Sequence, residues 1–285
     1  MSGSAQQAEQ ATTVQPTTGT LRVGDGSLYY EVAGAGHPLV LIHAGVADSA
    51  MWDDQFEEFA QRYRVIRYDT RGFGQSKTED VEFSDRQDLH DLLKHLDVEM
   101  AHVIGTSRAG QIAVEYTLEH PEMVSALVVV AAGLDGLQGE PTEAEMALFI
   151  ESGAAEEAKD WAKAAEMDVR IWGDGPLQAE GRFPEALREK MRRMCLNIYT
   201  AHTTKGKPQQ FDPPAATRLS EIKAPTLIVL GDYDVSPIIT MSDQLKQAIV
   251  GARKVVIPGT AHMVPMEKPQ EFNKTVLDFL GELDK

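Results

Sequence analysis

The chain has 285 residues, of which 42% are hydrophobic, enough to build one large α/β domain or two small ones. A formal net charge of −17 argues against nucleic acid or an anionic membrane surface as a partner. The single cysteine, Cys195, excludes an intrachain disulfide and any metal site built on several thiolates. Its neighbours Met191, Met194 and Leu196 indicate a buried small hydrophobe rather than a nucleophile. No apolar run approaches the ~20 residues that a bilayer-spanning helix needs.

Residues 1–18 predict a disordered tail, because Ser, Gln, Ala, Thr and Glu dominate and beyond Met1 only Val14 is bulky and apolar. The tail lacks the basic start and apolar centre of a secretory signal. We therefore expect a cytoplasmic protein.

The next segments predict an alternation of strands and helices. Residues 20–23 and 28–32 flank Gly24-Asp25-Gly26 and indicate a β-hairpin. Residues 38–42 form a continuous apolar run, which is typical of a parallel strand buried on both faces. The pattern then predicts a helix capped by Ser49, a strand at 64–68, a helix from about Ser84, a strand that reaches Val103-Ile104, and a strand at 126–131.

The alternation breaks at residue 136. From there to residue 216 the sequence predicts only helices, at 141–150, 154–171 and 183–199. The alternation of strands and helices then resumes with strands at 226–230 and 254–257. Two further helices are expected, one at about 239–249 and a last one carrying Phe272 to Leu283. This pattern indicates an α/β fold with a mostly parallel central sheet and helices on both faces. We predict a core of residues 19–135 and 217–285, with 136–216 as a helical cap over the carboxyl edge of the sheet.

The most informative stretch is Val103-Ile104-Gly105-Thr106-Ser107-Arg108-Ala109-Gly110. A buried strand leads through small residues to a serine, and a helical pattern follows at once. A sharp strand-to-helix turn exposes the serine hydroxyl and needs small residues on both sides, here Gly105 and Ala109. The Arg108 N–H would lie beside the hydroxyl at the helix N-terminus, where negative charge is favoured. Ser107 is therefore the candidate nucleophile.

An activated serine needs a base and a carboxylate that orients it. Among the eight histidines, only His262 follows a predicted buried strand in a late loop. Asp234 follows the strand that ends near Leu230, with Asp232 two residues before it. These positions predict His262 as the base and an aspartate of the 232–234 loop as its partner.

The order Ser107, Asp234, His262 and the Gly105-x-Ser107-x-Ala109 turn resemble the α/β-hydrolase superfamily. The stretch Asp69-Thr70-Arg71-Gly72-Phe73-Gly74-Gln75-Ser76 is similar to a structural turn common in these enzymes. Ala109 departs from the usual final glycine of the elbow. The resemblance implies that the acid stands three residues after a strand-ending glycine, which favours Asp234. Asp232 and Asp135, the latter used by another branch of the family, stay as alternatives.

The resemblance also implies an oxyanion hole of two backbone N–H groups. One is that of Arg108, and the other comes from the loop His43-Ala44-Gly45-Val46, where Gly45 is favoured and Val46 is the alternative. His43 is expected to pack and to form hydrogen bonds rather than to act as an acid or base. Ala44 stands where the family usually has glycine.

The resemblance to small carboxylesterases and 3-oxoadipate enol-lactonase-like proteins implies hydrolysis of a small, apolar ester or lactone through an acyl-enzyme, with no cofactor or metal. Carbon–carbon bond hydrolysis, cofactor-free perhydrolysis and a non-catalytic ligand-binding role are the alternatives. The Arg108 side chain is a candidate partner for a substrate carboxylate. The predicted cap supplies residues that could line an apolar pocket or pack against one another: Met146, Phe149, Ile150, Trp161, Met167, Trp172, Phe183, Leu187, Met191 and Met194.

Overall fold

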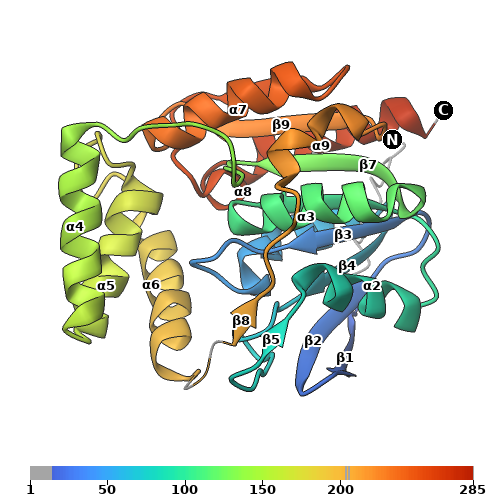
Figure 1. The fold of residues 1–285 in the computed structure, drawn as a ribbon, viewed down its shortest axis with the longest axis horizontal. Helices are drawn as coiled ribbons and strands as arrows, with labels where there is room; N and C mark the ends of the chain where they lie inside the picture. Colours follow the sequence, from blue (N-terminus) through green and yellow to red (C-terminus); the bar gives the residue numbers. More distant parts are fainter. Residues whose placement is uncertain (1–14, 203, 205, 285) are drawn as a thin grey trace, which may run out of the picture.

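The computed structural model describes residues 15–202, 204 and 206–284. Its centre is an eight-stranded sheet (Figure 1) in which β2 is antiparallel to β1 and β4, and the remaining neighbours are parallel. In spatial order the strands are β1 (Thr17–Val23), β2 (Gly26–Ala33), β4 (Arg64–Tyr68), β3 (Pro38–Ile42), β6 (Ala101–Thr106), β7 (Val124–Val130), β9 (Thr226–Gly231) and β10 (Arg253–Ile257). The predicted mostly parallel sheet is confirmed.

The predicted hairpin is β1 and β2, which pair from Thr17 with Val32 to Val23 with Gly26. Thr17 and Thr18 therefore belong to a strand, which corrects the expected end of the tail. The ladder extends this far because β2 continues to Ala33 and offers partners to both threonines. Residues 1–14 of the predicted tail lie outside the described residues.

Helices cover both faces of the sheet. Because successive side chains of a strand point to opposite faces, each strand contributes to the core on both sides. Leu39 and Leu41 of β3 belong to the core under α1 (Asp53–Phe59) and α9 (Pro269–Leu283). Val40 and Ile42 belong to the core under α2 (Asp85–His95), α3 (Arg108–Glu119) and α7 (Ser236–Ala248). The uninterrupted apolar run of β3 is thus explained by burial on both faces.

One predicted helix cap is wrong. The helix expected to start at Ser49 begins as a 3₁₀ turn, Ser49–Trp52, whose N-cap is Asp48, and the Asp48 side chain accepts a hydrogen bond from Ala50 N. Ser49 instead donates its backbone N–H to Asp69 Oδ1 at 2.8 Å. The predicted start of α2 is confirmed, because the Ser84 hydroxyl accepts from Gln87 N.

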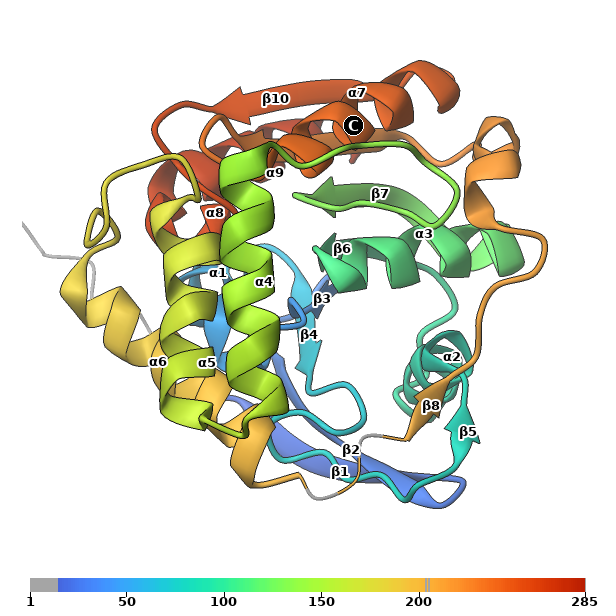
Figure 2. The same cartoon turned by 60° about the vertical axis from the view of Figure 1, so that its left-hand side comes forward.

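Between β7 and β9 the chain forms α4 (Glu143–Glu157), α5 (Trp161–Asp168) with a following π-helical turn (Val169–Asp174), and α6 (Glu185–Thr200). We call residues 143–200 the insertion. Its helices stand together at one end of the sheet (Figures 1 and 2). A two-residue strand, β8 (Lys207–Pro208), follows and pairs with β5 (Glu82–Phe83), although the sequence shows no strand there. Pairing of this length is set by tertiary contact rather than by a sequence pattern.

The insertion lies against loops that follow the carboxyl ends of the parallel strands. Cys195 of α6 donates its thiol to Val46 O after β3, and Asn197 donates to Gly74 O after β4. Glu145 of α4 accepts from Ser236 N after β9. The short α8 (Val264–Glu267) precedes α9. Within the described residues, no helix is long and apolar enough to span a membrane.

Candidate active site

Ser107 occupies a strained turn between β6 and α3. Its backbone lies at φ 57° and ψ −123°, a conformation that residues other than glycine rarely adopt. Two backbone hydrogen bonds of 2.8 Å hold the turn, from Ser107 N to Val130 O and from Gly110 N to Ser107 O. The Ser107 side chain is partly exposed, whereas the strand before it is buried. The predicted sharp strand-to-helix turn is therefore present.

The glycines around the serine explain why the turn can be this tight. A Cβ on Gly105 would lie 2.1 Å from Ala109 O, so no larger residue fits there without moving the backbone. A Cβ on Gly110 would lie 2.4 Å from the Ala132 Cβ. The close approach on the helix side is thus at Gly110, one residue beyond Ala109. The sequence contains this glycine, but the spacing of the familiar motif does not point to it.

His262 and Asp234 form a buried pair. The imidazole Nδ1 lies 2.9 Å from Asp234 Oδ1 and 3.0 Å from Oδ2, and the two side chains are 2% and 0% exposed. Val235 N donates to Asp234 Oδ1 at 2.8 Å, which fixes the carboxylate. A carboxylate at Nδ1 favours a proton on that nitrogen and leaves Nε2 as the basic atom.

The loops that carry this pair are packed closely together. Tyr233 N donates to Thr260 O at 2.9 Å, and a Cβ on Gly231 would lie 2.1 Å from the same oxygen. The two alternative acids have other partners. Asp232 Oδ1 accepts from Gly259 N at 2.5 Å, and Asp135 Oδ2 accepts from Gln111 Nε2 at 3.2 Å. Of the three aspartates weighed from the sequence, the structure brings Asp234 to His262.

Gly45 lies next to Arg108. A Cβ on Gly45 would be 3.6 Å from the Cβ of Arg108, so the loop after β3 and the first turn of α3 meet there. His43 supports this loop: Nε2 accepts from Thr70 N at 3.0 Å, which leaves Nδ1 to donate to Ala44 O at 2.8 Å. Burial lowers the pKa of His43, which keeps the ring neutral. This agrees with a packing role rather than acid–base chemistry.

The Arg108 side chain is already engaged. Its Nη2 donates to both carboxylate oxygens of Asp85, at 2.9 and 3.0 Å, and Nη1 donates to Thr70 Oγ1 at 3.2 Å. The guanidinium also lies over the Phe73 ring, 5.0 Å from its centroid. The expectation that it receives a substrate carboxylate is not supported by these contacts, because bidentate pairing with Asp85 satisfies the charge.

A cavity of about 250 Å³ opens beside Gly45. It is lined by Gly45, Val46, Phe73, Glu156, Asp168, Cys195, Ile198 and Tyr199. None of the ten apolar residues proposed from the sequence is among these lining residues. Phe183, Met191 and Met194 instead belong to the buried core, and Met146 and Ile150 are exposed. Trp172 does reach the site, where the centroid of its ring lies 4.6 Å from the centroid of the His262 ring.

Asp168 is the functional candidate that sequence reasoning missed. Its side chain accepts a hydrogen bond from the Tyr199 hydroxyl at 2.8 Å, and the residue is 6% exposed. Burial raises the Asp168 pKa to about 6, against the opposing effect of hydrogen bonds from Tyr199, Cys195 and Trp172. In the sequence it is one acidic residue among many on predicted helices, and no local signal distinguishes it.

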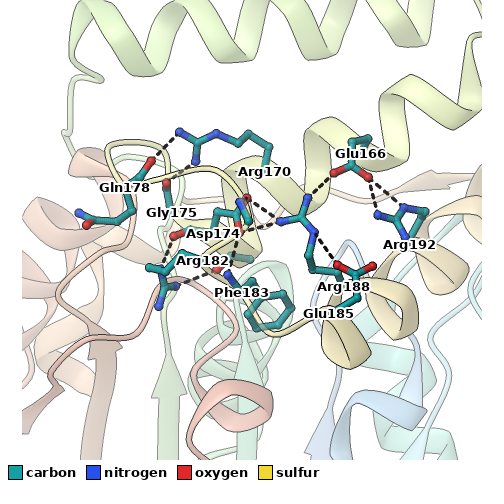
Figure 3. A network of polar contacts seen from close by, with 12 residues as sticks. Glu166, Arg170, Asp174, Gly175, Gln178, Arg182, Phe183, Glu185, Arg188 and Arg192 are labelled. Atoms are coloured by element: carbon teal, nitrogen blue, oxygen red, sulfur yellow. Dashed lines mark hydrogen bonds and ion pairs between the residues drawn. The ribbon is translucent and has the colours of Figure 1, made fainter.

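The insertion also holds the loop that carries His262. Figure 3 shows a network in which Asp174 accepts from Arg188 Nη1 at 2.7 Å and from Phe183 N at 2.8 Å. Arg182 belongs to this network and pairs with Glu267, whose Oε2 accepts from Ala261 N at 2.9 Å. Arg182 also donates to Gly259 O at 3.1 Å. The contacts thus run from the insertion to the residue before His262.

No group of three or more His, Cys, Asp or Glu side chains within the described residues is arranged to hold a metal ion.

The fold is that of the α/β-hydrolases. The model of the family described as "alpha/beta hydrolase fold" matches residues 37–269. The chain belongs to this family, and the resemblance inferred from the elbow and the order of the motifs is confirmed.

Its relatives are named as hydrolases of different kinds. The chain is 30% identical, over 92% of its length and 98% of the relative's, to a protein of Azorhizobium caulinodans named as a carbamate hydrolase, RutD. It is 29% identical, over 90% of its length and 91% of the relative's, to a Paraburkholderia phymatum protein named 2-hydroxy-6-oxononadienedioate/2-hydroxy-6-oxononatrienedioate hydrolase.

Solved structures of other hydrolases superpose on this chain. A structure described as Est816, an N-acyl homoserine lactone degrading enzyme, is 25% identical and superposes with a TM-score of 0.72, covering 92% of this chain and 100% of that chain. The enol-lactonase from Burkholderia xenovorans LB400 has a TM-score of 0.73 at 20% identity, over 92% of this chain and 100% of its own, and supports the fold alone.

Proposed function

We propose that the protein is a serine hydrolase that cleaves a carboxylic ester or lactone through an acyl-enzyme on Ser107. The observation that carries the proposal is the combination of a serine held at φ 57° at the start of α3 with a buried Asp234–His262 pair. Strain of this kind is kept where the surrounding structure imposes it, and it exposes the hydroxyl of a nucleophile. The named hydrolases among the relatives support the same class.

In the proposed reaction, His262 Nε2 takes the Ser107 proton as Oγ attacks the carbonyl carbon. The N–H groups of Gly45 and Arg108 donate to the oxyanion, while Asp234 holds the imidazolium. The C–O bond to the leaving alcohol then breaks, and that alcohol takes the proton from His262. His262 then takes a proton from water as the water oxygen attacks the acyl carbon. The bond between that carbon and Ser107 Oγ breaks, Oγ takes the proton from His262, and the acid is released. In a lactone, the leaving alcohol stays attached to the acid.

Carbon–carbon bond hydrolysis is the second candidate, because several relatives carry names of hydroxy-oxo-dienoate hydrolases, at 26–29% identity. The same serine, base and acid would serve that reaction. Comparing kcat/KM for a 2-hydroxy-6-oxo-dienoate with those for acyl esters and lactones of graded size would rank the two candidates. A preference for the dienoate would replace the ester and lactone assignment.

The test is Ser107→Ala with p-nitrophenyl butyrate and a fluorophosphonate probe. We expect turnover to fall by roughly a thousandfold or more and labelling to stop. Ser242→Ala is the matched control, because Ser242 is a buried serine on α7 outside the site, and both activities should persist. Unchanged hydrolysis in Ser107→Ala would refute the mechanism. Ligand binding by the wild type without labelling or turnover would favour a binding protein.

A further inference from the structure

The cavity beside Gly45 contains a carboxyl group that the proposed reaction does not use. Asp168 ends α5, is 6% exposed, and shares the cavity lining with Glu156 of α4. Within the described part of the chain, neither carboxylate forms an ion pair with Lys, Arg or His. Three basic side chains of α5 and α6 are engaged elsewhere: Lys163 pairs with Glu151, and Arg188 and Arg192 pair with Glu166. The residues that line the cavity thus include two carboxylates and no Lys, Arg or His.

Two sets of contacts connect the cavity lining to the proposed reaction centre. Gly45 and Val46 line it, and Gly45 is the proposed oxyanion donor next to Arg108. In addition, the centroid of the Trp172 ring lies 4.6 Å from that of the His262 ring, and hydrogen bonding from the Trp172 side chain lowers the pKa of Asp168. One indole ring thus separates the carboxyl group from the base. A substrate whose carbonyl lies at Ser107 has this cavity as a place for a short side arm.

Asp168 retains capacity to bind a ligand. An ionised carboxylate has about four acceptor positions. Among the described residues, three donors act on it: the Tyr199 hydroxyl, Trp172, and the Cys195 thiol, whose single proton is shared with Val46 O. These three donors leave one of the four positions for a donor in the cavity. A cationic donor would also supply a positive charge that compensates the buried carboxylate for its lost hydration.

We propose that this cavity is a substrate subsite in which Asp168 binds an ammonium or other strong hydrogen-bond donor on the ester or lactone, and that it excludes substrates with a second carboxylate. The inference rests on the proposed function for its reaction. It separates this chain from relatives whose names specify dienedioates, because those substrates are dianions that the cavity charge would repel.

The kinetic test uses three p-nitrophenyl esters of similar length: pentanoate, 5-ammoniopentanoate and the glutarate half-ester. At about pH 8, where Asp168 is ionised, we expect the ammonium ester to exceed the neutral one in kcat/KM by about tenfold and the glutarate half-ester to fall about tenfold below it. D168N keeps the acceptor for Tyr199 and removes the charge, so both ratios should approach one. E157Q, at the exposed end of α4, should leave both ratios unchanged.

The ratio of ammonium to neutral kcat/KM should also rise as pH increases through about 6, because the pKa of Asp168 lies there. The titratable groups that face Asp168 are Glu156 from α4 and Cys195 and Tyr199 from α6, and none of these is a cation that could mask the effect.

Binding of the same esters to S107A and to S107A/D168N by calorimetry separates this inference from the reaction. Tighter binding of the ammonium ester to S107A, lost in the double variant, supports the subsite even if turnover proves to be of another kind. Equal binding of the ammonium and neutral esters, or a preference that D168N leaves unchanged in a folded protein, overturns it. Hydrolysis by S107A would instead overturn the proposed function.

Discussion

At the level of single residues, the acid of the proposed triad is the assignment that can be tested most cleanly. Asp234→Asn keeps a hydrogen-bonding group beside His262 but removes the charge and favours the wrong imidazole tautomer. We expect kcat to fall by roughly a thousandfold or more. Asp232→Asn is the matched control, because an amide oxygen can still accept from Gly259 N, and turnover should stay within about threefold. Equal losses in the two variants would refute the assignment.

The elbow makes a second prediction at this scale. Gly105→Ala would place a methyl group 2.1 Å from Ala109 O, so we expect a loss of about 2 kcal/mol or more in the free energy of unfolding, together with lost turnover. Ala109→Gly restores the familiar motif and should lower stability by only about 1 kcal/mol, with activity kept within a few-fold. Urea unfolding and ester turnover measure both. A tolerated Gly105→Ala would contradict the described turn.

Among elements, the insertion and the His262 loop are joined by Arg182. Arg182→Gln removes the pair with Glu267 and the bond to Gly259 O, so the loop loses its support. We expect kcat to fall about tenfold, since even a small misplacement of a catalytic base lowers the rate of the reaction strongly.

Arg170→Gln provides the comparison. Arg170 donates to Gly175 O and Gln178 O (Figure 3) and also to Pro176 O, all within the insertion. Its loss should therefore lower thermal stability without lowering kcat by more than about twofold. If the two variants lowered kcat equally, the contact with Glu267 would have no special part in holding the His262 loop.

For the whole molecule, His102 predicts how stability depends on pH. The ring is buried against His37, with centroids 4.3 Å apart, and burial followed by the His37 charge lowers its pKa to about 4. The unfolded chain binds the proton near pH 6.5, so stability is lost as pH falls from about 6.5 to about 4, by up to about 3 kcal/mol. His102→Gln should flatten the fall in Tm over this window. An unchanged slope would exclude His102 as its source.

Much of the fold follows from the sequence, because strands buried on both faces leave uninterrupted apolar runs and the elbow fixes where β6 ends. The site follows less completely. Ser107, His262 and Asp234 stand at strand ends, where position in the chain limits the choice. Asp168, Gly110 and the Arg182–Glu267 pair depend on how the insertion packs on the core, and local sequence patterns do not encode that packing.

The most direct test of the account is to capture the covalent intermediate. Wild-type protein quenched in acid during turnover of p-nitrophenyl acetate should carry one acetyl group, and peptide mapping should place it on Ser107. Asp234→Asn should carry less of it, and Ser107→Ala none. Turnover that continues in Ser107→Ala, or acetylation mapped to another residue, would contradict acyl transfer through the elbow serine.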